Sequence, residues 1–184
     1  MKWTLPFVIL LMLSGPVGAA EWRMDAAESA VTFAIVIEGT PTEGTFPRFN
    51  AEIDFDPARL DQSKAVIVFD LTHIEAFYSD VAENLKKESW FDVKRFPEAR
   101  FVSQRFRHLG GRKFQVTGDL TIRDVTRRET LDFTLTRYDE QQAEILGRMT
   151  ISRLTYGVGQ AAWRSVSMVA EQVDLTVKIS ARRK

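Results

Sequence analysis

Apolar and polar residues alternate at every second position along most of the chain after about residue 30. This period of two is typical of β-strands that bury one face and expose the other. The alternation therefore predicts about eight strands. Six clear segments cover 31–37, 49–55, 65–71, 114–122, 131–135 and 173–179, and two weaker ones cover 100–107 and 143–151.

Short polar or glycine-rich links separate several of these segments. Asp56-Pro57 ends the second, Gly110-Gly111 predicts a hairpin, and the polar run 138–142 predicts another tight connection. Links this short favour antiparallel neighbours. Because so many strands must hide their edges, the sequence predicts an all-β, mainly antiparallel domain that closes into a barrel or folds into a sandwich.

One segment breaks the alternation. The residues from Asp80 to about Ser89 favour a helix, and Asp80 with Glu83 resembles a capping box with Asp in place of Ser or Thr. We therefore expect one short helix in the connection between the third and fourth strands.

The first 20 residues have a different pattern from the rest. A positive start at Lys2, an apolar run over 3–13 and small residues up to Ala20 form the three parts of a cleavable signal peptide. A transmembrane helix needs about 20 apolar residues, and Pro16 interrupts this run early. We expect residues 1–20 to be a signal peptide, cut after Ala20 or Ala19, and residues 21–184 to form one exported domain.

Composition narrows the function classes. The 25 basic and 25 acidic residues balance, so nothing favours nucleic acid as a partner. The absence of Cys removes disulfides and thiol nucleophiles, and only His73 and His108 could supply imidazole. We therefore predict no metal site and no catalytic site, and both histidines are expected at the surface.

Two further patterns have simple structural interpretations. The run Gly157–Ala162 superficially matches a dinucleotide fingerprint, but no strand–helix frame surrounds it, so a bend between the last two strands is expected. A basic stretch indicates either a solvated hairpin or a contact with anionic lipid head groups. It contains Arg105, Arg107, Arg112 and Lys113.

Three blocks in sequence resemble the YceI-like polyisoprenoid-binding family. They are SWFDVKRFPEARFVS over 89–103, GDLTIRDVT over 118–126 and RLTYGVG over 153–159. The opening from Trp22 to Phe49 also fits, and the likeness runs from about 21 to 181. The chain departs from the family at Glu28, where a His often stands, and at Asp124, which replaces a usual Gly.

The resemblance implies an extended eight-stranded barrel, similar to a lipocalin, with an isoprenoid chain in its lumen. It also implies a periplasmic location and no cofactor apart from the lipid ligand, which is a polyprenyl species or an isoprenoid quinone. Phe91, Phe96 and Pro97 are expected to pin the helix against the barrel.

The inward-facing apolar residues are the candidates to line the lumen, and each could equally be plain core. They are Phe33, Ile35, Ile37, Ile53, Phe55, Ile67, Phe69, Phe101, Phe114, Val116, Leu120, Leu131 and Phe133.

The first functional hypothesis is a non-enzymatic binding protein that carries or sequesters an isoprenoid lipid. The alternatives are an accessory partner of a membrane electron-transfer or stress-response system, and an enzyme that acts on a lipid in the barrel through His73 or Tyr78. The sequence is also compatible with peripheral membrane contact and with a homodimer.

Overall fold

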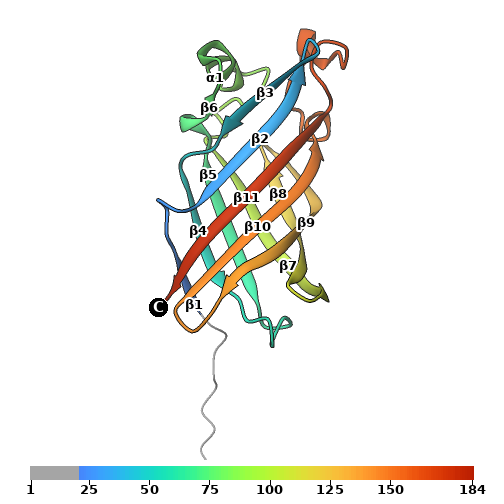
Figure 1. Cartoon of the computed structure of the whole chain (residues 1–184). Helices are drawn as coiled ribbons and strands as arrows, with labels where there is room; N and C mark the ends of the chain where they lie inside the picture. Colours follow the sequence, from blue (N-terminus) through green and yellow to red (C-terminus); the bar gives the residue numbers. More distant parts are fainter. Residues whose placement is uncertain (1–20) are drawn as a thin grey trace, which may run out of the picture.

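The computed structural model describes residues 21–184, and antiparallel strands make up most of it (Figure 1). The predicted signal peptide, residues 1–20, lies outside the described residues. The strands are β1 (Glu21–Met24), β2 (Ala30–Ile37), β3 (Thr40–Thr45), β4 (Phe49–Asp54), β5 (Lys64–Asp70), β6 (Glu75–Ala76), β7 (Glu98–Gly110), β8 (Lys113–Ile122), β9 (Val125–Tyr138), β10 (Gln142–Ser152) and β11 (Gln172–Arg183). The helical elements are α1 (Ser79–Leu85) and the short 3₁₀ helices η1 (Leu71–His73), η2 (Arg153–Tyr156) and η3 (Ala161–Arg164).

The strands close into an eight-stranded barrel in the order β1-β4-β5-β7-β8-β9-β10-β11, and the pairing of β1 with β11 completes the ring. Two of the eight positions around the barrel are each occupied by two strand segments: β1 and β2 share one position, and β3 and β4 share the next. β11 pairs with β2 along its first half and with β1 at its end, while β3 pairs with β2 and β4 pairs with β1. The predicted all-β barrel is confirmed, and so is the predicted helix, because α1 lies in the connection between β5 and β7.

Some local predictions differ from the structure. The alternation pattern missed the short strands β1, β3 and β6. The predicted capping box is wrong, because Tyr78 is the N-cap of α1 and makes no side-chain cap, while Asp80 lies in the first turn. The helix also ends earlier than expected, at Leu85.

Aromatic side chains fill one end of the barrel, which we call the aromatic end. The Phe55 ring lies 5.4 Å from that of Phe106, 5.7 Å from that of Phe114 and 5.9 Å from that of Phe133. Trp22 packs 5.7 Å from Tyr138 at the same end. These rings come from β1, β7, β8, β9 and the residue after β4, so the inward faces of the strands meet there.

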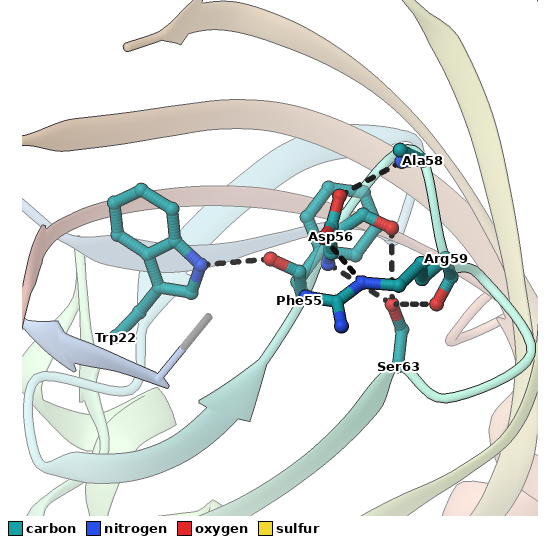
Figure 2. A network of polar contacts seen from close by, with 6 residues as sticks. All are labelled: Trp22, Phe55, Asp56, Ala58, Arg59 and Ser63. Atoms are coloured by element: carbon teal, nitrogen blue, oxygen red, sulfur yellow. Dashed lines mark hydrogen bonds and ion pairs between the residues drawn. The ribbon is translucent and has the colours of Figure 1, made fainter. Parts of the chain in front are cut away.

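Polar contacts in the connection between β4 and β5 hold the aromatic end together (Figure 2). The Trp22 indole Nε1 donates to the Phe55 carbonyl at 2.9 Å. The Asp56 carboxylate accepts from the Ala58 backbone at 2.9 Å and from Arg59 Nε at 2.9 Å. The Asp56 backbone N–H donates to Ser63 Oγ at 3.0 Å. The connection is therefore tied to itself and to the first strand.

The opposite end of the barrel, which we call the mouth, is built from less regular elements. It is surrounded by α1, η2, η3 and the β2–β3 turn, which stand at the top in Figure 1. The loop before β11 docks on the end of β2, where the Glu38 N–H donates to the Met168 carbonyl at 2.7 Å. This loop and α1 cover the mouth from two sides.

A two-part apolar cavity as the candidate functional site

The barrel encloses two adjoining cavities. The larger has a volume of about 280 Å³ and lies toward the mouth, and the smaller has about 130 Å³ and lies toward the aromatic end. Four residues line both cavities and therefore form a waist between them: Val31, Phe69, Leu120 and Leu175. The result is a tube-like apolar space in two parts, of the concave and mostly apolar kind in which small molecules bind.

Twelve of the thirteen predicted lining residues face these cavities. The larger cavity contains Phe33, Ile35 and Ile37, the smaller contains Ile53, Phe55, Ile67, Phe101, Val116, Leu131 and Phe133, and Phe69 and Leu120 belong to both. Their role in binding a ligand stays a prediction.

Phe114 differs from the other candidates because it lines neither cavity. Its ring is stacked 5.7 Å from that of Phe133 and lies 4.7 Å from the His108 ring. Alternation correctly predicts that this side chain is buried. It cannot show that neighbouring rings occupy all the space around it.

Several lining residues lie outside the regular strands and were missed. Phe91, which we expected only to pin the helix, lines the larger cavity together with Trp90. Others come from α1, from the connection between β10 and β11, and from the residues that follow β3 and β5. They include Phe46, Leu71, Val81, Leu85, Tyr156, Val158, Trp163, Met168 and Val169. The only sequence signal for them is that many fall in or beside the family blocks at 89–103 and 153–159.

Arg153 organises the irregular side of the mouth. Its side chain is buried, at 3% exposure, and a guanidinium has five N–H donors. All five are engaged by backbone oxygens at 2.8–3.2 Å, those of Val158, Gly159, Trp163, Val169 and Ala170. The Arg153 side chain thereby fixes the backbone of the segment 158–170 in place over the cavity. Burial lowers the pKa of Arg153, and nearby Glu171 partly opposes that shift.

Glycine is required beside this guanidinium. Gly159 has a φ of 78°, in the left-handed region, and a Cβ there would collide with Arg153 Nη1. Gly159 therefore lets the backbone of the predicted bend approach Arg153 closely, which is a packing role.

Tyr156 closes the gap that opens between β9 and β10 near the mouth. The ladder between these two strands ends at the Arg148–Asp132 pair, and beyond it η2 carries Tyr156 into the barrel. The Tyr156 side chain is 0% exposed, and its hydroxyl donates to Glu129 Oε1 at 2.6 Å. Burial, together with the bond to Glu129, raises the pKa of Tyr156 far above that of a free tyrosine.

Few polar groups at the mouth are available to a ligand. Glu38, Asp80 and Asn84 line the larger cavity, and the Asn84 side-chain oxygen already accepts from Lys87 Nζ at 2.7 Å. The donors of Arg153 and Tyr156 are used within the protein. The polar groups that remain include the two carboxylates, the amide NH₂ and the Trp90 indole N–H, which is buried without a hydrogen-bond partner within residues 21–184.

Exposed apolar side chains surround the mouth. Phe77 is 80% exposed and packs edge-on against Tyr78, with 4.9 Å between the ring centroids. Val166 and Met168 are exposed on the other side, and Met168 also lines the cavity. The apolar lining therefore continues onto the outer surface, which is unusual for a solvent-exposed rim.

The two histidines lie outside the cavity. His73 Nδ1 contacts Asp70 at 2.8 Å, and His108 Nε2 contacts the Gly111 carbonyl at 2.8 Å on the β7–β8 hairpin. Within residues 21–184, no group of three or more His, Cys, Asp and Glu side chains is placed to hold a metal ion. No helix in this range is long and apolar enough to cross a membrane.

The fold and the cavity define a closed antiparallel barrel with an apolar interior, the architecture of a binding protein. The chain belongs to the YceI-like family, because the YceI-like domain matches residues 22–181. The resemblance seen in the three sequence blocks is thus confirmed. A UPF0312 protein of Pseudomonas putida is 29% identical over 127 residues, which is 67% of this chain and 66%, slightly under two thirds, of that relative.

Solved structures agree with this assignment. The crystal structure of BcnA from Burkholderia cenocepacia has a TM-score of 0.81 and 30% identity, with 86% of this chain and 99% of that chain covered. A domain from Saccharophagus degradans, described as a polyisoprenoid-binding domain implicated in plant cell wall breakdown, has a TM-score of 0.72. It is 11% identical over 90% of this chain and 99% of its own, so this second likeness concerns the fold alone.

Proposed function

We propose that this protein is a non-enzymatic binding protein for an isoprenoid lipid, which it carries or sequesters with the tail in the two-part cavity. The observation that carries this proposal is the continuous apolar lining on both sides of the waist. A branched hydrocarbon chain gains roughly 0.8 kcal/mol for each buried CH₂ group, and ordering the flexible tail offsets part of that gain. A narrow tube suits a long, thin tail better than a compact ligand.

The polar groups of the mouth favour an uncharged head group. Glu38 and Asp80 repel a phosphate, and Arg153 can bind one only by releasing backbone oxygens of the mouth. Asn84 can donate to a carbonyl oxygen, while the carboxylates can accept from a hydroxyl. We therefore propose an isoprenoid quinone or its quinol rather than a polyprenyl phosphate.

The location and the lack of catalysis are also part of this proposal. The three-part pattern of residues 1–20 supports export to the periplasm. The polar groups that reach the cavity from η2 are held in structural contacts, Arg153 by carbonyls and Tyr156 by Glu129. They serve packing rather than proton transfer. The name of the Saccharophagus degradans domain agrees with an isoprenoid ligand.

The test is native mass spectrometry of the purified mature protein, followed by lipid extraction. We expect a co-purifying isoprenoid, or uptake of an added long-chain quinone that quenches the fluorescence of Trp90 and Trp163. Polyprenyl phosphate is expected to bind more weakly, and Asp80→Asn and Glu38→Gln should reduce that difference. A protein that is empty and also ignores the added quinone would refute the proposal.

One observation favours a second role, as an accessory partner of a membrane system. Phe77 is 80% exposed beside the mouth, where a partner protein could cover it. A photo-crosslinking residue at position 77, used in intact cells, should then give a reproducible adduct with one membrane protein. The same residue at the exposed position Thr126 is the control. A pure carrier should give no specific adduct at either position.

A further inference from the structure

The β7–β8 hairpin carries an isolated group of positive charges. Its tip, residues 105–113, contains four basic side chains and no acidic residue. Arg105, Arg107, Arg112 and Lys113 are all exposed, and within the described part of the chain their side chains make no hydrogen bond or ion pair. On the neighbouring strand β9, by contrast, Arg128 pairs with Asp119 at 2.7 Å.

An apolar side chain stands among these charges. Leu109 is 50% exposed at the point where the hairpin turns. Gly110 and Gly111, with φ of 107° and 55°, allow a tight connection to Lys113. The His108 ring lies 4.7 Å from Phe114, and its Nε2 contacts the Gly111 carbonyl at 2.8 Å. The tip is therefore held in one shape, and Leu109 is presented without the need to order a loop.

The hairpin also projects from its neighbour on one side. The pairing of β5 with β7 ends at Val66 and Val102, whereas β7 and β8 stay paired to Gly110 and Lys113. In Figure 1 the hairpin extends at the lower right of the barrel, at the end opposite α1. The charged tip can thus touch a flat surface while the mouth stays uncovered.

We propose that this hairpin docks the protein onto the surface of an anionic phospholipid bilayer. Four unpaired cations complement the phosphates of such a surface, and Leu109 enters the head-group region between them. The proposal goes beyond lipid binding in the cavity, because it concerns the opposite end of the molecule. Docking in this orientation leaves the mouth free, so protein with and without lipid cargo binds vesicles equally.

The experiment is co-sedimentation of the mature protein with vesicles of phosphatidylcholine alone or mixed with phosphatidylglycerol. Wild type should bind only the mixed vesicles, and binding should fall steeply between low and physiological salt. The quadruple variant Arg105→Gln, Arg107→Gln, Arg112→Gln and Lys113→Gln should lose at least tenfold in vesicle affinity. Leu109→Ser should lose less, about threefold to tenfold, and should keep the salt dependence.

A matched quadruple variant controls for net charge. It changes Arg23, Arg48, Arg100 and Arg148 to Gln. These four residues are exposed outside the hairpin tip, so this variant should keep most of the vesicle binding. Circular dichroism and quinone quenching of both variants should match those of wild type, because none of the eight residues lines a cavity.

Three results would overturn the proposal: equal sedimentation with both vesicle types, unchanged binding by the hairpin variant, or an equal loss in the control variant. Quinone binding without vesicle binding refutes only the hairpin proposal. Vesicle binding without quinone uptake refutes only the function proposed for the cavity.

Discussion

The two ends of the barrel are closed by different physical means. At the aromatic end, inward rings from successive strands pack against each other, and the network around Asp56 ties the β4–β5 connection together. At the mouth, irregular segments are gathered by the backbone contacts of one buried guanidinium, that of Arg153. Packed rings dominate the first end, whereas at the second a single side chain makes five of the hydrogen bonds that hold the loop over the cavity.

This difference fits a protein that must exchange a ligand. Cooperative ring packing is costly to open, because each aromatic side chain loses many contacts at once. A loop that is held largely by hydrogen bonds can open locally while the strands stay paired. The aromatic end is thus suited to act as a fixed floor, and the mouth as the place where a lipid enters and leaves.

The largest expected effect comes from removing the guanidinium at the mouth. Arg153→Met leaves five backbone oxygens without their donor, and we expect a loss of about 3 kcal/mol or more in the free energy of unfolding. Arg153→Lys should rescue only part, because an ammonium has three donors. Urea unfolding gives the stability, and limited proteolysis should show new cleavage within 158–170. Cleavage first in the β4–β5 connection would contradict this assignment.

The waist between the two cavities is the next test, because it separates the mouth side from the aromatic side. Leu175→Phe narrows the waist, and we expect the affinity for a long-chain quinone to fall by about tenfold, since the tail no longer reaches the smaller cavity. A short-chain quinone that fits the larger cavity should bind as in wild type. Fluorescence titration of both ligands measures the difference.

A control for the waist variant lies on the outside of the same barrel. Leu146→Phe makes the same chemical change at an exposed position of β10 and should alter neither affinity. If Leu175→Phe weakens both quinones to the same degree, the tail does not pass the waist.

The two ends also differ in how far the sequence predicts them. The alternation of Phe114, Val116 and Leu120 predicts the strands and their inward face, since a period of two is a local property of the chain. It cannot distinguish a side chain that borders empty space from one that other rings surround. For this reason the alternation predicts that Phe114 lines the lumen with the others, although it packs within the aromatic end.

The mouth could be predicted only through the family resemblance. Trp90, Tyr156 and Trp163 follow no period, because they stand on turns and short helices whose direction depends on distant contacts. The role of Arg153 depends on backbone oxygens up to 17 positions away, which no pattern of side chains reveals. The motif around Gly157 marks the segment as important without showing what the arginine binds.

A smaller effect is expected in the network of the aromatic end. The Ala58 backbone N–H, with Arg59, holds the pKa of Asp56 below that of a free aspartate. Because the pKa of Asp56 is lower in the folded protein than in the unfolded chain, ionised Asp56 stabilises the fold at pH values above the unfolded pKa of about 4. This stabilisation is lost as the pH falls below about 4, through the pKa of the folded state. Asp56→Ala should cost about 1–2 kcal/mol at neutral pH and flatten the acid loss of stability. Urea unfolding at several pH values measures both, and an unchanged acid slope would contradict the assignment.

The smallest effect compares one tyrosine from each end. Tyr156→Phe removes the hydroxyl that donates to Glu129, and we expect a loss of about 1 kcal/mol at neutral pH, because the half-buried carboxylate recovers some water. Tyr138→Phe, at the aromatic end, should lower the free energy of unfolding by less, since the Tyr138 hydroxyl has no hydrogen-bond partner within residues 21–184.

The raised pKa of Tyr156 means that wild type loses stability as the pH rises above about 10, where the unfolded chain ionises first. Tyr156→Phe should therefore show a shallower alkaline fall in the free energy of unfolding. Equal costs for the two variants at neutral pH would mean that the Tyr156–Glu129 bond does not stabilise the mouth.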